Sequence, residues 1–466
     1  MSKFVNRKQE LKFLEEKFKS DKAELLIIYG RRRIGKTELI LNFCKNKEYL
    51  YFMGRLESRE DTLKRLNNLL IEHFHDKNLL NSPIQNVDAF FEYLAEKADK
   101  KLIFIIDEFP FLVDRLPEIV SIIQEKWDSR LKNSKLMLVL SGSSISMMEK
   151  YALDYKSPLY GRRTGQWKVD KISIAHLNEF FPDYSIEDII KLYSCLDCIP
   201  GYLTIFSPEK TFLDNLKEKM FSKGEFLYEE IEILLREEFR DPSNYMSIIS
   251  SIAGGLTTFN EIFNKTMLDK SLLSKYLSIL EVLGIVEKEI PITESYKSKL
   301  KAKGALYFLS DNFFDFWFRF VYLNKQELEQ GNFEFVLKSL KRDMDLFISR
   351  KFENFSREFL SICNLWKFNK IGRWWNKNEE IDVIALNEEK KEILLGECKW
   401  ADNINAENIV RGCLEKSKFV EWNKENRKES FAVFAKSFSR KIKEFEGKTV
   451  YCFDLKDIKK ELKKLL

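Results

Sequence analysis

The chain is poor in the two residues that interrupt regular structure, with 9 prolines and 17 glycines among 466 residues. Long flexible linkers are therefore not expected. We find no signal peptide and no apolar run long enough to cross a bilayer, so we expect a cytoplasmic protein without a membrane partner. The seven cysteines are scattered, which favours reduced thiols. Cys195 and Cys198 form one C-x-x-C, but a zinc site needs a second pair or nearby histidines, and only three histidines exist.

Charge of one sign is also not in large excess, because 78 basic residues face 73 acidic ones. The formal net charge of +5 does not by itself indicate a nucleic-acid partner, so any basic surface has to be local. A chain of this length exceeds what one hydrophobic core supports, and roughly three domains are expected.

The most informative motif lies at residues 30–37. It fits the pattern G-x-x-x-x-G-K-[ST] and reads Gly30-Arg31-Arg32-Arg33-Ile34-Gly35-Lys36-Thr37. The apolar run at 25–29 predicts a buried strand before it, and residues 38–43 predict a helix after it. Such a loop folds its N–H groups around a phosphate, the lysine reaches the β- and γ-phosphates, and the hydroxyl of Thr37 binds Mg²⁺. We therefore expect ATP and Mg²⁺ here.

A second motif follows another buried strand, predicted at residues 102–106. This strand runs directly into Asp107 and Glu108. In P-loop enzymes an acid at this place holds Mg²⁺, and an adjacent glutamate can orient the attacking water. We predict Asp107 as a metal ligand and Glu108, with Lys36, as catalytic. Further strands are predicted at 136–140 and 166–169, and the hydroxyls at 141–144 either sense the γ-phosphate or form a plain turn.

The middle of the chain changes from alternating strands and helices to helices alone. Residues 1 to about 170 have the pattern of a parallel α/β domain. Helices are then predicted at 186–196, 211–221, 227–239, 245–253, 258–263 and 270–283. The last three precede a strand pair at 285–290 and 305–309, an order typical of a winged helix-turn-helix. The aromatic run at 313–320 is interpreted as a core helix rather than a stacking surface for bases.

The third helix of this segment separates apolar from polar residues. Leu273, Tyr276, Leu277 and Leu280 recur at helical spacing and are expected to face inward. The residues left outward, where base or phosphate contacts would form, are Lys270, Ser271, Ser274, Lys275 and Ser278. Lys297, Lys299, Lys301 and Lys303 lie between the strands and would contact phosphates as a wing. We expect duplex DNA as a partner; the alternative is a solvated hairpin in a protein-docking domain.

A second chemical constellation lies near the C-terminus, where residues 381–386 and 392–399 predict a β-hairpin. Period-two geometry places Glu397 and Lys399 on one face, and Asp382 lies on the partner strand. The two carboxylates, with Glu353 from an upstream helix, would bind Mg²⁺ or Mn²⁺ for attack on a phosphodiester, and Lys399 would assist. We expect these carboxylates to be exposed at a sheet edge. The alternative is a surface ion pair without chemistry.

The N-terminal half resembles the archaeal-type ATPases of the STAND group, which are relatives of the AAA+ proteins. Residues 4–11 resemble their opening F-x-G-R-x-x-E-L box, with Asn6 in place of the usual glycine. Tyr160-Gly161-Arg162-Arg163 is similar to a G-R-R element of the group, so either Arg162 or Arg163 reaches the γ-phosphate, or the segment is a solvated turn. Ile199-Pro200-Gly201 resembles a helical-domain element that touches the nucleotide, and only Pro200 carries over.

The C-terminal order of Glu353, Asp382 and Glu397-x-Lys399 resembles the PD-(D/E)xK nuclease superfamily. Residues 307–320 and 371–375 also resemble archaeal ATPases that carry a C-terminal nuclease-like domain. The resemblance implies an α/β chain in five parts: a P-loop ATPase core with a parallel sheet (1–172), a helical lid subdomain (173–242), a winged helix (243–310), an aromatic helical linker (311–345) and a restriction-endonuclease-like domain (346–466).

We therefore predict a slowly hydrolysing switch ATPase that is coupled to DNA binding and to metal-dependent DNA cleavage. One alternative is an ATP-dependent DNA-binding regulator whose nuclease-like domain is an inactive scaffold. Another is a protein-docking ATPase that never meets DNA. A homo-oligomer is left open, as are the DNA structure recognised and the triggering signal.

Overall fold

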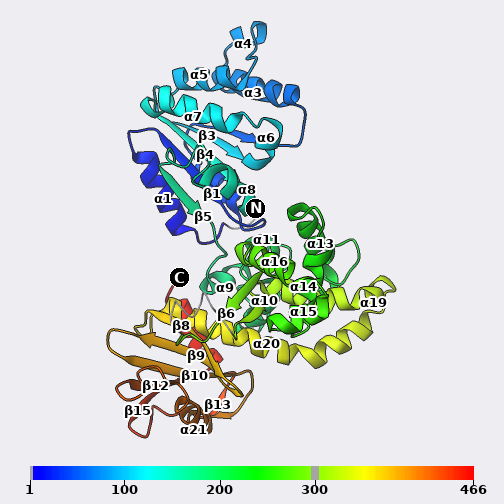
Figure 1. Cartoon of the computed structure of the whole chain (residues 1–466), viewed down its shortest axis with the longest axis vertical. Helices are drawn as coiled ribbons and strands as arrows, with labels where there is room; N and C mark the ends of the chain where they lie inside the picture. Colours follow the sequence, from blue (N-terminus) through cyan, green and yellow to red (C-terminus); the bar gives the residue numbers. More distant parts are fainter. Residues whose placement is uncertain (1–3, 295–303) are drawn as a thin grey trace. The chain divides into compact units, whose positions relative to one another are not determined.

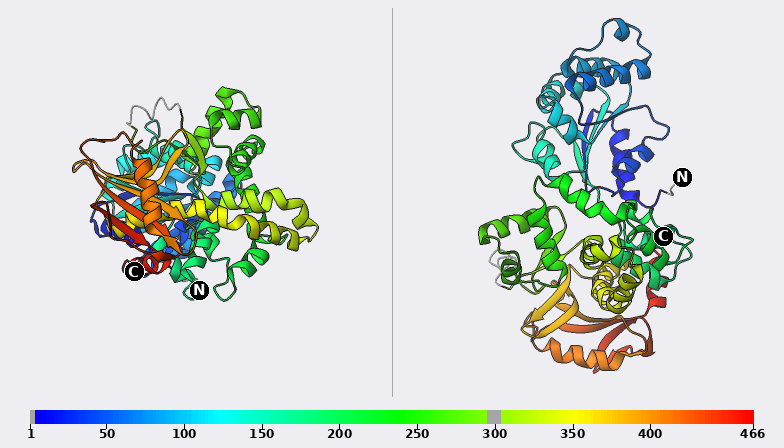
Figure 2. Two further views of the ribbon diagram at one scale, coloured as in Figure 1. Left: turned by 90° about the horizontal axis from the view of Figure 1, so that it is seen from below. Right: turned by 90° about the vertical axis from the view of Figure 1, so that its right-hand side faces the viewer.

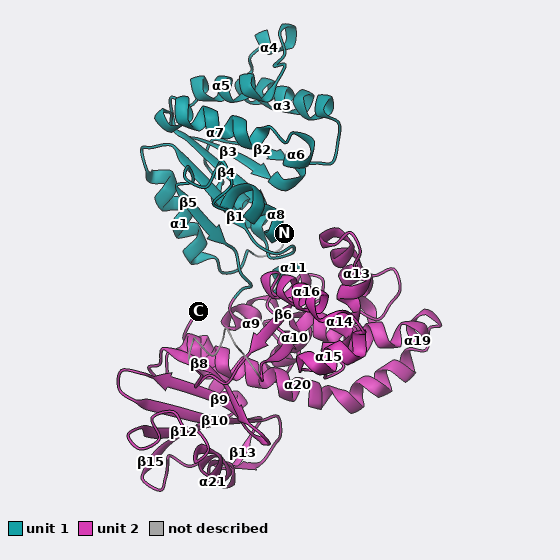
Figure 3. Ribbon diagram, in the orientation of Figure 1, with its two compact units in different colours: residues 1–172, 199–201 teal, residues 173–198, 202–466 magenta. Residues whose placement is uncertain are grey.

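The computed structural model describes residues 4–294 and 304–466 (Figure 1). It divides into two compact units (Figure 3). Unit 1 comprises residues 1–172 together with 199–201, and unit 2 comprises residues 173–198 and 202–466. The four lysines of the expected wing, Lys297, Lys299, Lys301 and Lys303, lie outside the described residues. The five domain boundaries expected from the sequence stay a prediction.

Unit 1 is built on a five-stranded sheet in the order β2-β3-β4-β1-β5, and every pair of neighbours is parallel. The strands are β1 (Glu24–Tyr29), β2 (Tyr49–Met53), β3 (Leu102–Asp107), β4 (Leu136–Gly142) and β5 (Gly165–Lys168). Strands β3 and β4 are buried along their whole length, as the central strands of a parallel sheet are. The expected parallel α/β sheet is therefore confirmed, and β2 is an addition to it.

Helices pack on both faces of this sheet (Figure 1). They are α1 (Lys8–Lys19), α2 (Lys36–Phe43), α3 (Arg59–Phe74), α5 (Val87–Lys97), α6 (Phe109–Arg115) and α7 (Ile119–Ser129). Leu66, Phe90 and Ile123 of α3, α5 and α7 join one apolar core with the strands. Helices α1 and α2 pack together, and the ring centroids of Phe18 and Phe43 lie 6.0 Å apart. The strands all point the same way, so the loops after β1, β3 and β4 meet at one edge, where ligands of such sheets bind.

Unit 2 begins with helices. They are α9 (Leu177–Phe180), α10 (Ile186–Leu196), α11 (Pro200–Leu203), α12 (Phe212–Lys219), α13 (Phe226–Glu238), α14 (Ser243–Ala253), α15 (Phe259–Thr266) and α16 (Lys270–Val282). The first residues of α11 belong to unit 1. Strands β6 (Val286–Glu289) and β7 (Leu306–Leu309) follow as an antiparallel pair. All the helices and strands predicted here are present.

Helix α16 has the two faces that its sequence predicts. Leu273, Leu277 and Leu280 are buried, while Tyr276 is only half-buried. The five polar residues expected to point outward are all exposed: Lys270, Ser271, Ser274, Lys275 and Ser278. The preceding helix α15 begins with a capping box in which Thr258 and Glu261 bind each other's backbone N–H groups. These contacts fix the entry of the helix pair and leave the polar face of α16 to solvent.

The aromatic run forms α18 (Asn312–Phe316) and the helical turn at Trp317–Val321, and its rings are buried. The indole Nε1 of Trp317 donates to the Tyr228 carbonyl at 2.9 Å, so its one polar atom is satisfied. The interpretation as a core helix is confirmed. Within it, the buried carboxylate of Asp315 binds both Lys351 and Arg319 at 2.7 Å. Burial raises the pKa of Asp315, but the two cations outweigh it and hold this pKa below its usual value.

The last part of unit 2 is a six-stranded sheet in the order β14-β15-β12-β10-β9-β8, preceded by the long helix α20 (Phe333–Cys363). Its strands are β8 (Lys370–Asn376), β9 (Glu379–Asn387), β10 (Glu392–Lys399), β12 (Lys428–Ala435), β14 (Glu444–Phe445) and β15 (Lys448–Phe453). Strands β8, β9 and β10 are antiparallel, whereas β10, β12 and β15 are parallel. The predicted hairpin is therefore present. Within the described residues, no helix is long and apolar enough to cross a membrane.

Two layers of helix enclose this sheet. Helix α20 lies on one face and α21 (Ala406–Ser417) on the other (Figure 2). Phe359 of α20 packs its ring against Phe434 and Phe453, while Val410 and Cys413 of α21 join the core with β9, β10 and β12. Because β9 and β10 lie inside the sheet, their acidic residues are not at an edge. The expectation of exposed carboxylates is wrong: Asp382 is 6% exposed and Glu397 4%.

Candidate functional site

The phosphate loop of unit 1 turns sharply between β1 and α2. Gly35 is the N-cap of α2 with φ +90, a left-handed conformation that favours glycine. A Cβ on Gly30 would lie 2.4 Å from the Val169 carbonyl oxygen, so only glycine fits there. The ammonium of Lys36 is buried in the loop and donates to the carbonyls of Gly30 and Arg31, both at 2.9 Å. The loop thus holds the cation inside the turn that precedes a helix N-terminus, which is the geometry of a phosphate cradle.

Two residues outside the motif support the loop from behind. Arg7 is 4% exposed, and its guanidinium donates to the carbonyl of Ile34 at 2.7 Å and to that of Asp170 at 2.6 Å. Asn6 adopts φ 63, so the asparagine makes the turn that a glycine makes in the resembling box. Gly201, beside Pro200, donates its N–H to the Arg33 carbonyl at 2.9 Å. The contact of Pro200 with the nucleotide stays a prediction, and its neighbour Gly201 ties this segment to the loop.

Gly201 has no room for a side chain. A Cβ there would lie 2.7 Å from Cβ of Arg33 and 2.9 Å from its carbonyl oxygen. We predict that Gly201→Ala displaces the loop and weakens ATP binding, because overpacking of this kind costs about 1–3 kcal/mol, or roughly 5- to 150-fold in affinity. Titration of a fluorescent ATP analogue measures the change. Gly412→Ala is the control, since nothing lies within 4 Å of its added Cβ. Equal affinity in both variants would contradict the supporting contact.

The predicted magnesium ligands meet at the ends of β3 and α2. The hydroxyl of Thr37 donates to Oδ2 of Asp107 at 2.7 Å. The phenol of Tyr51, on β2, donates to the same oxygen at 2.9 Å. Burial and the adjacent Asp107 carboxylate raise the pKa of Tyr51, which keeps the phenol protonated as a donor. Hydroxyl and carboxylate oxygens at this distance fit Mg²⁺, which takes few protein ligands and keeps phosphate or water on its other positions.

Glu108 lies next to this pair in a left-handed conformation with φ 50. Its carboxylate accepts a hydrogen bond from the Ser143 N–H at 3.2 Å and another from the Ser143 hydroxyl. The hydroxyl that the sequence offered as a phosphate sensor therefore contacts the glutamate. The adjacent Ser141 is buried, and its Oγ makes no hydrogen bond within the described structure. This arrangement orients the carboxylate that would polarise the attacking water.

The two candidate arginines of the G-R-R element are engaged elsewhere in unit 1. Arg162 binds Asp128 at 2.6 Å and the Pro158 carbonyl at 2.9 Å. Arg163 donates to the Leu153 carbonyl at 3.3 Å and lies over the Tyr160 ring. These contacts favour a turn without a role at the γ-phosphate, although both arginines are bonded within unit 1 rather than merely solvated.

The C-terminal constellation is assembled in part. On β10, Lys399 Nζ lies 2.9 Å from Glu397 Oε2, on the same face as predicted. Lys416 of α21 reaches the other oxygen of this carboxylate at 2.7 Å. Burial lowers the pKa of both lysines, but Glu397 outweighs it, so both pKa values lie above the usual one. Each carboxylate oxygen of Glu397 therefore forms an ion pair with a lysine. Cys398 points away and is buried, as expected.

Asp382 and Glu353 complete the acidic group. The Cys398 N–H donates to Asp382 Oδ2 at 2.8 Å, and the Arg357 guanidinium donates to the Asp382 carbonyl at 2.8 Å. Glu353 on α20 lies 3.7 Å from Arg373 of β8. Burial, followed by the charge of Glu397, raises the pKa of Asp382 to about 6. Burial, followed by the charge of Asp382, raises the pKa of Glu353 to about 7. Raised pKa values of this kind are typical of functional carboxylates.

These residues do not yet form a metal centre. Across residues 4–294 and 304–466, no group of three or more His, Cys, Asp or Glu side chains is placed to hold a metal ion. Glu397 turns to the α21 face and is held by lysines, whereas Glu353 comes from α20 and pairs with Arg373. Asp382 and Glu397 would suit Mg²⁺ as hard oxygen donors, provided that the lysines move. The Cys195–Cys198 pair carries free, buried thiols.

Several of these functional neighbours were missed from the sequence. Tyr51 and Lys416 follow no motif, and Arg373 lies in a strand segment that we noted only as a family resemblance. The only sequence feature that marks Lys416 is its place near the end of the helix that follows β10. Many other lysines also lie near helix ends, so this feature is not specific. Their contacts depend on how distant elements pack.

Comparison with known proteins agrees with the geometry of unit 1. A family model described as an ATPase domain predominantly from Archaea matches residues 4–206. A second model, described as "Archaea bacterial proteins of unknown function", matches residues 317–410. The Walker-type ATPase PABY2304 of Pyrococcus abyssi shares the fold, with a TM-score of 0.54 and 20% identity, over 68% of this chain and 96% of its own.

Two relatives come from Methanocaldococcus jannaschii. The uncharacterized ATP-binding protein MJ0423 is 62% identical over 45 residues, which is 10% of this chain and 76% of that protein. The uncharacterized protein MJECL04 is 38% identical over 461 residues, which is 97% of this chain and 99% of MJECL04. Residues 4–206 are thus an ATP-binding ATPase domain of the archaeal type, and the chain as a whole belongs to the same family as MJECL04.

Proposed function

We propose that this protein is an ATP-dependent switch whose C-terminal sheet carries a metal-dependent nuclease site directed at DNA. The observation that carries the proposal is the convergence of Asp382, Glu397 and Lys399 on two adjacent strands. The order of α20, three antiparallel strands, α21 and a parallel strand supports the nuclease-like fold that the sequence resemblance implies.

In the ATPase domain, the side chains divide the work between binding and turnover. Lys36 would neutralise the β- and γ-phosphates, and Thr37 and Asp107 would hold Mg²⁺, which offsets the charge of the phosphates. Glu108 would accept the proton of the attacking water, with Ser143 fixing its carboxylate. The chain offers Arg162 and Arg163 as phosphate sensors only if their present contacts break, so slow hydrolysis is expected.

DNA binding is supported by the exposed polar face of α16. Lys270 and Lys275 are both exposed on a helix whose opposite face is buried, as in a recognition helix. We predict that Lys270→Ala with Lys275→Ala weakens duplex binding and flattens its salt dependence. Each lost phosphate contact removes about 0.9 from the slope of log K against log salt. Lys338→Ala with Lys341→Ala, on exposed α20 positions, is the control. An unchanged slope would show that α16 is not the DNA contact.

The nuclease proposal includes a resting state. Lys399 and Lys416 occupy the two oxygens of Glu397, and Arg373 pairs with Glu353. A divalent ion would need at least one of these cations to leave, so cleavage is expected to require a signal. When bound, such an ion supplies an activated water and stabilises charge at the phosphate. Lys399 would then be free to stabilise the developing charge beside the phosphodiester.

One experiment tests the proposal directly. The full-length protein and its Asp382→Asn variant are incubated with plasmid and linear DNA in Mg²⁺ or Mn²⁺, with and without ATP. Metal-dependent cleavage by the wild type alone is expected, and it should change when ATP is present. Cleavage by both proteins would point to another site or to a contaminant.

A second function has an observation in its favour. The two lysines already satisfy Glu397, and no three-donor metal group exists in the described residues. This favours an ATP-dependent DNA-binding regulator that uses the C-terminal sheet as a scaffold. If the wild-type protein binds DNA but cleaves neither plasmid nor linear DNA under any of these conditions, this second function is established.

A further inference from the structure

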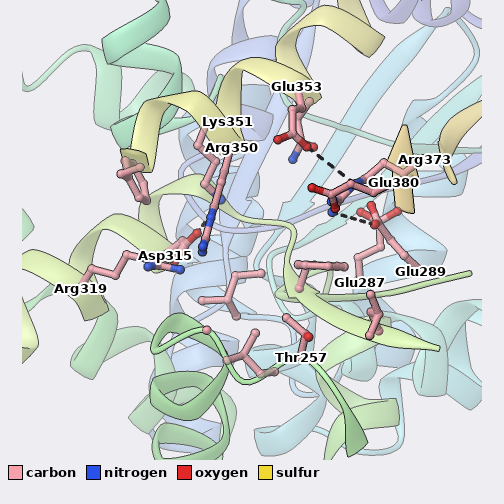
Figure 4. Close-up of a pocket in the computed structure, with 17 residues that line it drawn as sticks. Thr257, Glu287, Glu289, Asp315, Arg319, Arg350, Lys351, Glu353, Arg373 and Glu380 are labelled. Carbon is pink, nitrogen blue, oxygen red and sulfur yellow. Dashed lines mark hydrogen bonds and ion pairs between the residues drawn. The ribbon is translucent and has the colours of Figure 1, made fainter. Parts of the chain in front are cut away.

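A cavity of about 370 Å³ lies within unit 2 (Figure 4). It is bounded by α18, the strand pair β6–β7, α20 and the hairpin of β8 and β9. This volume is in the range of small-molecule sites. Of the residues assigned above to a nuclease site, the cavity shares only Glu353.

The charges around this cavity are separated. One wall carries Arg319, Arg350 and Lys351 with a single carboxylate, Asp315, whereas the facing wall carries Glu287, Glu289 and Glu380 around Arg373 (Figure 4). Glu353 lies between the two walls. The cavity is therefore electrically polar, and a matching ligand carries an anionic group at one end and hydrogen-bond donors at the other.

The basic wall has capacity for an anion. Lys351 and Arg319 share the Asp315 carboxylate, so it cannot neutralise both. Arg350 is exposed, and within the described residues its guanidinium makes no hydrogen bond and no ion pair. A guanidinium next to a buried ammonium is well suited to a phosphate group, because it donates two parallel hydrogen bonds.

The acidic wall has a carboxylate oxygen that can accept a hydrogen bond from a ligand. Oε2 of Glu289 and Nε of Arg373 are buried and make no hydrogen bond within the described residues, although the two side chains lie 3.7 Å apart as an ion pair. Buried polar atoms of this kind usually have a partner. The rings of Phe308 and Phe347 also line the cavity. Arg373 lies over the Phe308 ring at 5.2 Å, and Lys351 lies 5.6 Å from the centre of the Phe347 ring. Aromatic rings at such a place can stack on a nucleobase.

We propose that this cavity binds one nucleotide unit with an amino-bearing base. The phosphate would lie against Arg350 and Lys351, the base against the phenylalanines, and the exocyclic amino group would donate to Glu289. Inorganic phosphate would match only the basic wall, and a polyamine only the acidic one. The nucleotide is either a free mononucleotide or the terminal nucleotide of a strand, and these two sources share the same contacts.

The test uses the full chain with Lys36→Ala, so that the phosphate loop does not compete for the ligand. AMP, CMP, UMP and inorganic phosphate are titrated by calorimetry, and a short single strand with a 5′-phosphate forms a second arm. We expect AMP or CMP, or the strand, to bind at least tenfold more weakly when Arg350→Ala is added. Arg342→Ala, an exposed arginine on the same helix outside the cavity, should leave binding unchanged. UMP should bind more weakly than CMP, because its base lacks the amino group.

The outcomes separate the sources and the alternatives. Arg350-dependent binding of a mononucleotide assigns a free ligand, and Arg350-dependent binding of the strand alone assigns a strand terminus. The proposal is overturned if neither binds, if phosphate binds as tightly as AMP, if UMP equals CMP, or if Arg350→Ala behaves as Arg342→Ala. Neither ATP turnover nor cleavage is measured, so failure here leaves the proposed switch and nuclease functions standing.

Discussion

Glu108→Gln is expected to bind ATP with nearly wild-type affinity and to hydrolyse it at least about 100-fold more slowly. The amide keeps the shape of the carboxylate and still accepts a hydrogen bond from Ser143, but it cannot accept a proton from water. The phosphate cradle of Lys36 and the Thr37–Asp107 pair is not touched by this change. Phosphate release under single-turnover conditions measures the rate, and binding of a fluorescent ATP analogue measures the affinity.

Lys36→Ala is the complementary variant. It removes the cation that lies inside the loop and is expected to abolish detectable ATP binding, so its hydrolysis disappears for a different reason. Ser143→Ala should give an intermediate loss of turnover, since Glu108 keeps its charge and the backbone hydrogen bond of residue 143 but loses the hydrogen bond of the hydroxyl. Wild-type turnover in Glu108→Gln would exclude this residue as the base.

Asp382→Asn is expected to abolish metal-dependent DNA cleavage while ATP hydrolysis continues at the wild-type rate. The amide still accepts the hydrogen bond of the Cys398 N–H, so the strand pair should stay folded. It removes the negative charge that a divalent ion needs, and losses of such a ligand reach several orders of magnitude. Glu397→Gln should behave in the same way. Lys399→Ala should slow cleavage without weakening metal binding, because an ammonium group is not a metal ligand and its removal frees an oxygen of Glu397.

The raised pKa values give this site a pH signature that does not depend on cleavage. A carboxyl with a raised pKa in the native state adds stability that is complete below the unfolded pKa, about 4, and is lost as the pH rises through the native value. For Asp382 and Glu353 these native values are about 6 and about 7. The metal-free protein should therefore lose stability between about pH 4 and pH 7 through these groups.

A divalent ion should reverse this loss, because it compensates the ionised carboxylates. Mg²⁺ is expected to raise the melting temperature by a few degrees at pH 8 and hardly at all at pH 5. In Asp382→Asn, the metal-free protein should melt at a higher temperature than wild type at pH 8, and Mg²⁺ should add little. Saturating ADP is kept constant in these scans, so that metal at the phosphate loop contributes equally. A Mg²⁺ shift of equal size in both proteins would place the ion elsewhere.

Local patterns predicted the positions of most elements of both sites. The phosphate motif lies between a strand and a helix as its spacing requires, and the β9–β10 hairpin pairs as its alternation predicts. The same reasoning could not tell that Asp382 and Glu397 are buried. A hairpin considered alone has two edges, and these strands lie inside the sheet because β10 also pairs with β12 and β9 also pairs with β8. Strand β2 was missed although its Tyr51 binds Asp107.

Contacts between distant segments account for the rest. Ser143 reaches Glu108 from the end of the next strand, and Lys416 reaches Glu397 from a helix on one face of the sheet. In the sequence, Ser143 and Lys416 look like many other serines and lysines. They differ from the others only in their contacts, which depend on how two distant elements pack. Asn6 stands where the resembling box has glycine, and asparagine tolerates the left-handed conformation that this position adopts.

The return of residues 199–201 to unit 1 determines where this protein can be divided. A fragment that ends at Ile172 would contain every residue of the phosphate motif and would still lack the Gly201 N–H that binds Arg33. Residues 173–198 belong to unit 2, and the chain then returns to unit 1 at residues 199–201. A cut within residues 173–198 therefore breaks the chain between the phosphate loop and Gly201, which binds that loop. Proteolytic cleavage within residues 173–198 is expected to lower the affinity for ATP, and bound ATP is expected to protect this segment from cleavage.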